Sequence, residues 1–244
     1  MTVYVEVCAG SLEDCAVAQQ CGADRIELNN AIHLGGLTPS IATLIEAKKI
    51  TTLPIITMVR ARPGGFHYNA YEIQTMITDA KYLLEHGSDG LVFGFLDAFS
   101  NVDKELTRRF VELAHTKGVE AIFHRAFDRA SDPIEAIEDL IACGVDRVLT
   151  SGQASSADQG IALLAKLQTE YGSQIEFCVG AGVNVDNANE IVAKTGISQV
   201  HSSFKGWFID PTTASDAVSY SYSESGDYEG VDTKKLKTFL ETVK

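Results

Sequence analysis

Hydrophobic and polar positions along the chain follow two alternating periods. Short runs rich in β-branched and aromatic residues, typical of buried strands, are separated by longer stretches whose apolar residues recur at the spacing of an amphipathic helix. The short runs predict strands at residues 3–7, 25–29, 54–60, 90–94, 119–124, 147–150, 175–179 and 199–201. The longer stretches predict helices at about residues 11–21, 38–50, 71–86, 103–117, 132–143, 158–172, 185–194 and 232–243.

The order of these elements predicts the fold class. Eight strand-then-helix units spread evenly over 244 residues favour an α/β fold, a single (β/α)8 TIM barrel that spans residues 1–244. Helix ends carry matching signals, such as Ser11 before the first helix and Gly22 and Gly144 after two others. A doubly wound open sheet is the alternative. However, no G-x-G-x-x-G turn follows the first strand, where a dinucleotide-binding fold normally carries it.

Residues 206–230 break the alternation. This segment has little apolar periodicity and is rich in Ser, Tyr, Asp and Glu, so we expect a long loop between the eighth strand and the C-terminal helix at 232–243. A loop of this length in a compact domain is either functional or mobile. A lid, a contact between subunits and plain disorder all remain open, and we expect limited proteolysis to cut here first.

Composition and charge limit the classes of function. Thirty-three acidic against 20 basic residues give a net charge of −13, which repels both a phosphate backbone and an anionic lipid surface. We therefore expect no nucleic-acid partner and no membrane partner, and no apolar run reaches the roughly 18 residues of a spanning helix. The five cysteines lack regular spacing and the first residues lack a signal-peptide pattern. Both features favour a cytoplasmic protein with reduced thiols.

Polar residues at the C-terminal ends of the strands are the candidate functional residues, because a TIM barrel carries its chemistry there. Side chains alternate along a strand, so the apolar residues at positions 3, 5 and 7 pack against helices and send Glu6 and Cys8 inward. The same alternation directs five further polar side chains into the barrel: Glu27, Asn29, Arg60, His124 and His201. Loops just beyond the strands add Arg62, Arg125 and Asp128.

So much charge inside a barrel is costly unless the ions pair with one another or with a ligand. One interpretation is an ion-pair network that only fills the barrel. The other is an acid–base site, because a carboxylate near a histidine exchanges protons near neutral pH and an arginine holds an anion. The second interpretation predicts catalytic roles for Glu6, Glu27, Arg60, His124, Asp128 and His201. Isomerisation, epimerisation or lyase chemistry suits such a set better than hydrolysis, since no G-x-S-x-G motif is present.

Small and polar residues follow the sixth, seventh and eighth strands. Loops at this position hold a phosphate in many barrels, because glycines let backbone N–H groups approach an anion. Together with two loop arginines they form the predicted substrate- or anion-binding set: Arg62, Arg125, Ser151, Gly152, Gly180, Gly182, Asn184, Ser202 and Ser203. The alternative is that these glycines only form tight turns between strand and helix.

No common metal-binding spacing, such as C-x-x-C or H-E-x-x-H, occurs in the chain. Cys8 is the one cysteine that we expect at the barrel mouth, where a thiolate beside an imidazole could bind a soft ion such as Cu(I). An isolated interior cysteine is more commonly a small apolar side chain. Both interpretations of Cys8 therefore stay open.

Seven motifs occur in a fixed order along the chain: Glu6-Val7-Cys8, GADRIEL at 22–28, GGLTPS at 35–40, FHRAFD at 123–128, RVLTSG at 147–152, GAGVN at 180–184 and VHSS at 200–203. Together they closely resemble the CutC family, the copper homeostasis proteins, from about residue 3 to residue 204. The resemblance implies a TIM barrel, a cytoplasmic protein that forms homo-oligomers, and a role in copper homeostasis in which cysteines bind the copper.

The chain departs from the family pattern at two cysteine positions. Where the family commonly reads Glu-Leu-Cys, this chain has Glu27-Leu28-Asn29, and residues 60–69 read RARPGGFHYN, with His67 in place of the second cysteine. These departures remove soft ligands for copper, whereas the acid–base residues match the family pattern. Three interpretations follow: a barrel enzyme that acts on a small anionic or phosphorylated metabolite, a copper-binding protein, and a scaffold without a ligand.

Overall fold

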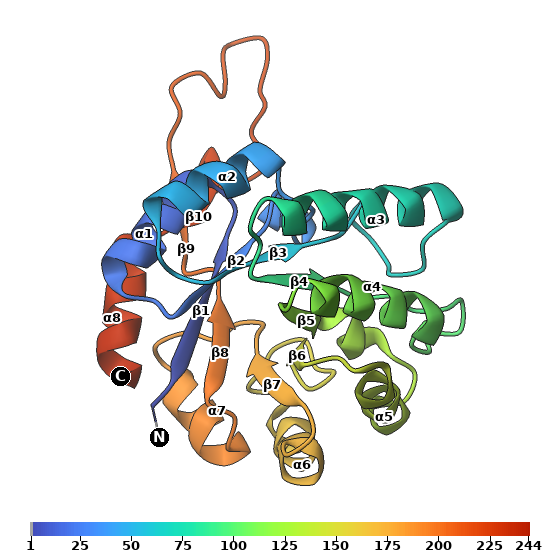
Figure 1. Ribbon diagram of the computed structural model, residues 1–244. Coiled ribbons are helices and arrows are strands. Elements are labelled where there is room, and N and C mark those ends of the chain that lie inside the picture. Colours follow the sequence, from blue (N-terminus) through green and yellow to red (C-terminus); the bar gives the residue numbers. More distant parts are fainter. Residues whose placement is uncertain (1) are drawn as a thin grey trace.

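The computed structural model describes residues 2–244 and shows a closed barrel of eight parallel strands, each hydrogen-bonded to the next in sequence (Figure 1). Strand β8 pairs with β1 and closes the barrel, with His201 opposite Glu6. The barrel strands are β1 (Tyr4–Ala9), β2 (Arg25–Leu28), β3 (Ile55–Met58), β4 (Gly90–Phe93), β5 (Glu120–Phe123), β6 (Arg147–Thr150), β7 (Glu176–Val179) and β8 (Gln199–Ser202). The TIM barrel predicted from the sequence is confirmed.

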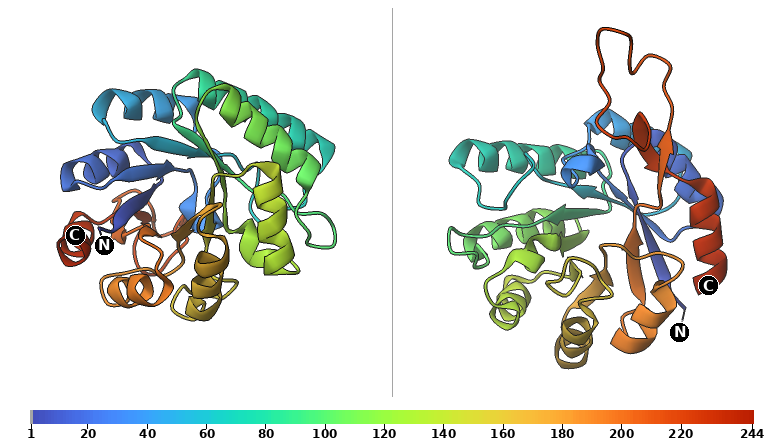
Figure 2. Two further views of the ribbon diagram at one scale, coloured as in Figure 1. Left: turned by 60° about the horizontal axis from the view of Figure 1, so that its bottom comes forward. Right: turned by 180° about the vertical axis from the view of Figure 1, so that it is seen from behind.

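The helices surround the barrel as an outer ring (Figure 2). They are α1 (Leu12–Cys21), α2 (Ile41–Ile50), α3 (Ala70–Glu85), α4 (Lys104–Thr116), α5 (Pro133–Cys143), α6 (Ile161–Tyr171), α7 (Ala188–Thr195) and α8 (Thr233–Val243). Short 3-10 helices, η1 (Ile32–Leu34) and η2 (Arg125–Arg129), follow β2 and β5. No helix among the described residues is long and apolar enough to cross a membrane.

Local signals explain where most helices begin and end. The Ser11 side chain accepts the backbone N–H of Asp14 at the start of α1, and Gly22 ends that helix in the left-handed conformation at φ 81°. Helix α7 begins at Ala188, three residues later than the sequence predicted. The Asn184 side chain accepts the backbone N–H of Asp186, and this turn delays the helix.

The hydrophobic core has two parts. The larger part fills the space between the strands and the helix ring and includes the stacked rings of Phe93 and Phe95. The smaller part lies inside the barrel and consists of Ile56, Met58, Val92 and Ile122. Above and below this inner apolar layer the barrel interior is polar, so the side chains at the two ends of the barrel determine its chemistry.

The segment predicted as a loop at 206–230 contains a hairpin at its base. Strands β9 (Lys205–Phe208) and β10 (Tyr228–Val231) pair antiparallel, and the backbone N–H of Val231 donates to Asp14 on α1. The sequence did not predict these strands because residues 206–230 show little apolar periodicity. Residues 209–227 extend from this hairpin as an arm beyond the body of the barrel (Figures 1 and 2).

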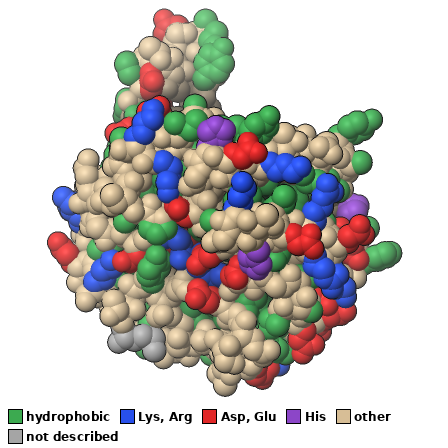
Figure 3. Space-filling view, viewed as in Figure 1, with side chains coloured by type: hydrophobic (Ala, Val, Ile, Leu, Met, Phe, Trp, Pro, Cys, Tyr) green, Lys and Arg blue, Asp and Glu red, His purple; other side chains and the backbone are tan. Residues whose placement is uncertain are grey.

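Acidic and basic side chains are interspersed over the face seen in Figure 3 and form no single patch of one sign there. Charged side chains of the chain also pair directly, including Lys48 with Asp89 at 2.6 Å and Lys244 with Asp24 at 2.8 Å. The net negative charge of the chain is therefore spread over this face rather than concentrated on it.

Candidate functional site at the barrel mouth

A cavity of about 400 Å³ opens at the C-terminal ends of the strands. Polar groups from β1, β2, β8 and the segment after β5 line it together with apolar side chains from β3 and β6. The lining residues are Cys8, Glu27, Asn29, Ile32, Gly35, Gly36, Met58, Arg60, Phe66, His124, Arg125, Leu149, Ala181, Gly182, His201, Ser202 and Ser203. The structure thus brings Cys8, Glu27, Arg60, His124 and His201 to one mouth.

Glu27 on β2 lies at the floor of this cavity and is only 2% exposed. Its Oε2 accepts a hydrogen bond from Asn29 Nδ2 at 2.7 Å and lies 3.8 Å from the Cys8 thiol, whereas Oε1 has no partner. Burial raises the pKa of this carboxyl above its ordinary value, and the nearby His201 opposes the shift. An acceptor atom without a partner is therefore held at the floor of the cavity.

His201 on β8 belongs to a chain of charges inside the barrel. Its Nδ1 lies 2.7 Å from Glu6 Oε1, and the other oxygen of Glu6 accepts from the Arg25 guanidinium. Burial alone would raise the pKa of Glu6, but Arg25 and His201 hold it well below its usual range. Burial opposes charge on His201, yet Glu27, Cys8 and Glu6 together raise its pKa well above the usual value. Glu6 therefore orients His201 from below the cavity, without lining it.

His124 follows β5 and has the opposite electrostatic character. Burial, helped by the positive charge of Arg60, lowers the pKa of His124 to about 3, so the ring is neutral at physiological pH. Its Nδ1 accepts the backbone N–H of Ala126 at 3.0 Å, which assigns the single ring proton to Nε2. His124 Nε2 is buried without a partner, so His124 offers a hydrogen-bond donor to whatever occupies the cavity.

Gly94, which follows β4, makes room for the His124 ring. A Cβ atom at position 94 would lie 2.3 Å from His124 Cε1 and 2.7 Å from the Cβ of Ala126. No side chain fits at this position unless His124 moves. The placement of the imidazole therefore depends on a glycine from the neighbouring strand.

Arg60 mainly braces the loops around the mouth. Its Nη1 donates to the carbonyls of Gly35 and Gly36 at 3.0 Å each, and its Nη2 donates to the carbonyl of Gly64 at 2.7 Å. The guanidinium lies over the ring of Phe66, 5.2 Å from the centroid. Its Nε is buried without a partner.

Two other residues predicted for the site lie outside the cavity lining. Arg62 pairs with Glu72 at 2.6 Å and donates to the carbonyls of Gly65 and His67, which shapes the loop before α3. Asp128 accepts from Thr150 and from the backbone and side chain of Ser151. Both residues hold loops in place in this structure.

Of Arg125 and the small residues predicted to bind an anion, some line the cavity and others do not. Arg125 lines the cavity while its Nε donates to Asp128 at 2.8 Å, and Gly182, Ser202 and Ser203 also line it. The remaining residues of the predicted anion set lie outside the lining: Ser151, Gly152, Gly180 and Asn184. Gly152 has a structural reason of its own, since a Cβ there would lie 2.5 Å from the carbonyl oxygen of Gly160. The predicted anion set is therefore only partly brought to the cavity, and Gly152 serves a close backbone contact instead.

Sequence reasoning did not assign roles to three contributors to the site. Asn29 was placed in the barrel interior, but its amide bridge between Cys8 and Glu27 was not foreseen. The ring centroid of Phe66 lies 5.0 Å from that of His124, and Phe66 belongs to a loop whose apolar residues show no regular spacing. Arg25 shares the inward face of β2 with Glu27, so the same alternation could have placed it beside Glu6.

Three potential metal ligands meet at the cavity floor. The Cys8 sulfur, a carboxylate oxygen of Glu27 and a ring nitrogen of His201 all lie within 4.8 Å of one another. Burial raises the pKa of the Cys8 thiol. His67 does not join this group, because it lies outside the cavity lining with Nδ1 3.3 Å from the carbonyl oxygen of Leu96.

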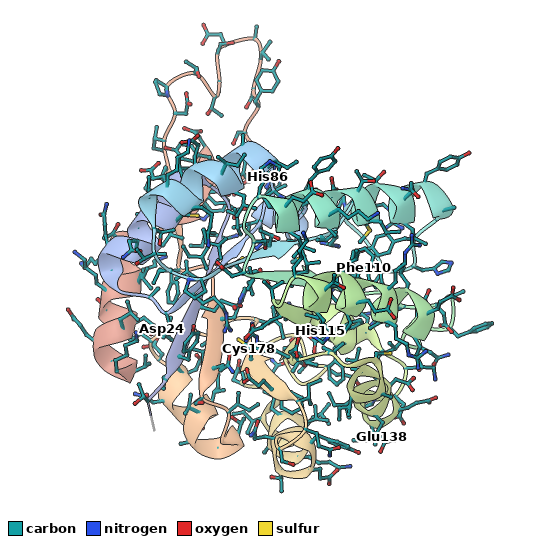
Figure 4. All side chains as sticks on the ribbon, in the orientation of Figure 1. Asp24, His86, Phe110, His115, Glu138 and Cys178 are labelled. Carbon is teal, nitrogen blue, oxygen red and sulfur yellow. The ribbon has the colours of Figure 1, made fainter. Side chains whose placement is uncertain are left out.

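The interior thiol of Cys178 lies in the middle of the barrel on β7 (Figure 4). Burial raises its pKa to about 12, so this cysteine stays protonated and acts as a small apolar side chain. All five cysteines of the chain are free.

A TIM barrel with titratable side chains gathered at its C-terminal mouth is the class that the fold and the site define. The chain belongs to the CutC family, whose family model matches residues 3–206. A CutC family protein of Treponema denticola is 44% identical over 199 residues, which cover 82% of this chain and 80% of the relative. The CutC family protein of Glaesserella parasuis is 37% identical over 243 residues and covers 98% of each chain.

Solved structures agree with this assignment. The crystal structure of CutC from Streptococcus agalactiae, named as a copper homeostasis protein, has a TM-score of 0.77 and 31% identity, and the match covers 82% of this chain and 98% of that one. Phosphoribosyl anthranilate isomerase from Thermococcus kodakaraensis has a TM-score of 0.59 at 14% identity over 99% of both chains. The second similarity shows the barrel fold alone.

Proposed function

We propose that the barrel mouth binds a small anionic molecule and transfers a proton on it. One observation carries this proposal: Glu27 Oε1 and His124 Nε2 are buried, face one cavity and have no partner within the protein. Leaving a buried polar atom without a hydrogen bond costs roughly 1–3 kcal/mol. A pair of such atoms at the functional end of a TIM barrel is better explained by a ligand than by a network that only fills the interior.

The two groups have complementary chemistry. Glu27, with its pKa raised by burial, is a stronger base than an ordinary carboxylate and is suited to accept a proton. The neutral His124 ring donates from Nε2 to an oxygen on which negative charge develops, as expected for a reaction beside a carbonyl group. Arg60 Nε and Arg125 supply positive charge at the wall of the cavity for an anionic substituent.

The remaining predicted residues support this arrangement. Glu6 fixes the orientation of His201, and Asp128 fixes the loop that carries Arg125. Ser202, Ser203 and the backbone at Gly182 line the same side of the cavity, where an acidic or phosphorylated end of the molecule would lie. We further propose that the protein acts in the cytoplasm as a homo-oligomer, as the family resemblance implies.

A panel of small carboxylates and phosphate esters tests this proposal by thermal unfolding. A ligand at about 100 times its Kd stabilises the folded state by roughly 2.7 kcal/mol. We expect at least one anion to raise the Tm of the wild type and not that of His124→Asn. The proposal is wrong if no anion raises the Tm of the wild type. It is also wrong if every anion that does so raises the Tm of His124→Asn by the same amount.

A second candidate function is the handling of copper, to which the Streptococcus agalactiae relative is assigned by name. The observation in its favour is that Cys8 lies within 4.8 Å of potential ligand atoms of His201 and Glu27. Competition for Cu(I) between the reduced protein and a chromogenic chelator tests this candidate. One bound equivalent that disappears in Cys8→Ala would support copper as the cargo, whereas complete loss of copper to the chelator from both proteins would exclude it.

A further inference from the structure

The three ligand atoms at the cavity floor are already close to the geometry of a metal centre. The Cys8 Sγ lies 3.8 Å from Glu27 Oε2, and His201 Nε2 lies 4.0 Å from the same oxygen. Ligands around a tetrahedral zinc ion, at bond lengths of about 2.0–2.3 Å, are separated by about 3.3–3.6 Å. Both of these pairs therefore need to close by less than about 1 Å. The third pair, Cys8 with His201, lies within 4.8 Å.

The orientation of His201 suits a metal ligand. Its Nδ1 faces Glu6 Oε1 at 2.7 Å, and Glu6 is itself held by Arg25. Metal-binding histidines commonly donate one ring N–H to a carboxylate in this way, which directs the other nitrogen to the metal. Here the other nitrogen, Nε2, is the atom that points toward Glu27.

The other two ligands are oriented as well. Asn29 Nδ2 donates to Glu27 Oε2 at 2.7 Å and lies 3.5 Å from the Cys8 Sγ, so one amide positions both side chains. Glu27 Oε1 stays buried without a partner, so the protein leaves part of this carboxylate unsatisfied. The oxygen that also supports the proposed function is therefore available to an ion bound at this cluster.

The donor set selects the class of metal ion. One thiolate, one imidazole and one carboxylate form the mixed sulfur, nitrogen and oxygen set of zinc sites, whereas Cu(I) favours several soft sulfur ligands and Mg²⁺ favours oxygen alone. We propose that Cys8, Glu27 and His201 bind a zinc-class divalent cation at the floor of the barrel mouth. The mixed donor set of this chain thus favours a zinc-class ion over Cu(I).

An ion held by three protein ligands keeps a fourth position open. Because Cys8, Glu27 and His201 line the same cavity as His124 and Arg60, an ion held by the three residues would be reached from that cavity. Zinc sites with three protein ligands and one open position are typical of catalysis, because the ion polarises an oxygen of the bound molecule. The metal proposal goes beyond the proposed function and does not depend on it, since the three ligands are in place without an organic ligand.

The test uses the reduced, full-length, metal-free protein titrated with Zn²⁺ against a chromogenic chelator, and with Co²⁺ as a spectroscopic probe. We expect one Zn²⁺ per chain, and a thiolate-to-cobalt charge-transfer band that appears in the wild type. Cys8→Ser and His201→Gln should each weaken Zn²⁺ binding by more than about 100-fold, whereas Cys21→Ser, which removes a thiol outside the mouth, should leave it unchanged. Glu6→Gln, which changes only the residue behind His201, should weaken binding by about 10–100-fold.

Each outcome decides the proposal. Zn²⁺ that binds equally to wild type and Cys8→Ser, the absence of a charge-transfer band, or preferential one-equivalent binding of Cu(I) over Zn²⁺ would overturn it. The cobalt spectrum of the wild type remains informative if a variant fails to fold. His124→Asn separates the two proposals, because it should keep Zn²⁺ binding and lose binding of the anion.

Discussion

Replacement of Glu27 by glutamine should stabilise the protein at neutral pH. Glu27 is 2% exposed, its Oε1 has no partner, and burial raises its pKa, so the ionised carboxylate is disfavoured in the folded state. Glutamine keeps an oxygen for the hydrogen bond from Asn29 and removes the buried charge. Residues retained for function commonly cost stability in this way.

The magnitude follows from the unsatisfied atom. A buried polar group without a partner costs roughly 1–3 kcal/mol, and part of this cost stays with the amide that replaces the carboxylate. We expect Glu27→Gln to raise the free energy of unfolding by about 1–2 kcal/mol. For a chain of this size each kcal/mol shifts the Tm by about 2–4 °C, so the expected increase is about 2–8 °C.

The pH dependence of the free energy of unfolding checks independently whether Glu27→Gln stabilises the protein. Because the folded pKa of Glu27 lies above its unfolded value, the folded state binds the proton more tightly. Wild-type stability should therefore fall as the pH rises from about 4.5 to the raised folded pKa, and the advantage of the glutamine variant should appear over this window.

Urea unfolding at pH 4, 5 and 8 measures this difference. Glu241→Gln, at an exposed position of α8, serves as the control and should change stability by less than about 0.5 kcal/mol. A loss of more than about 1 kcal/mol at both pH 5 and pH 8 for Glu27→Gln would refute the reasoning and assign Glu27 to a structural network.

Three further predictions concern His124 and the arm. Nitrogen NMR should find His124 neutral from pH 5 to 8 with its proton on Nε2, and a titration near its ordinary value of 6.5 would contradict the burial of a neutral ring. Gly94→Ala should cost about 1–3 kcal/mol in urea unfolding and shift the His124 resonances, because its Cβ would lie 2.3 Å from the ring. Gly65→Ala, with nothing within 4 Å, should do neither. Limited proteolysis should cut first within residues 209–227, where Ile209 is 76% and Tyr220 is 81% exposed, and first cleavage in a barrel loop would count against this assignment.

The barrel and much of its mouth were predictable from the sequence because strand alternation is a local property. Each strand end places its own polar side chain, so Glu27, His124 and His201 could be directed inward one strand at a time. The closed barrel then brings these ends together. The prediction of inward-facing side chains needed no knowledge of which strand pairs with which.

The partners of long side chains were not predictable in the same way. Arg60 donates to carbonyls of residues 34–36 and 64, and these loop conformations depend on the packed structure rather than on local periodicity. Arg62 likewise turns to Glu72 and not to the cavity. The hairpin formed by β9 and β10 depends on pairing across more than twenty residues. Spacing along the chain contains no signal for such contacts.

Recovery of a bound molecule would show directly whether the barrel mouth binds a small anion. Wild type, Glu27→Gln and His124→Asn are dialysed in parallel against a small-molecule extract of bacterial cells, and the compounds retained by each protein are identified by mass spectrometry. We predict that the wild type enriches an anionic compound and that His124→Asn does not retain it. If three folded proteins retain the same compounds in the same amounts, the mouth of the barrel is not the ligand site proposed here.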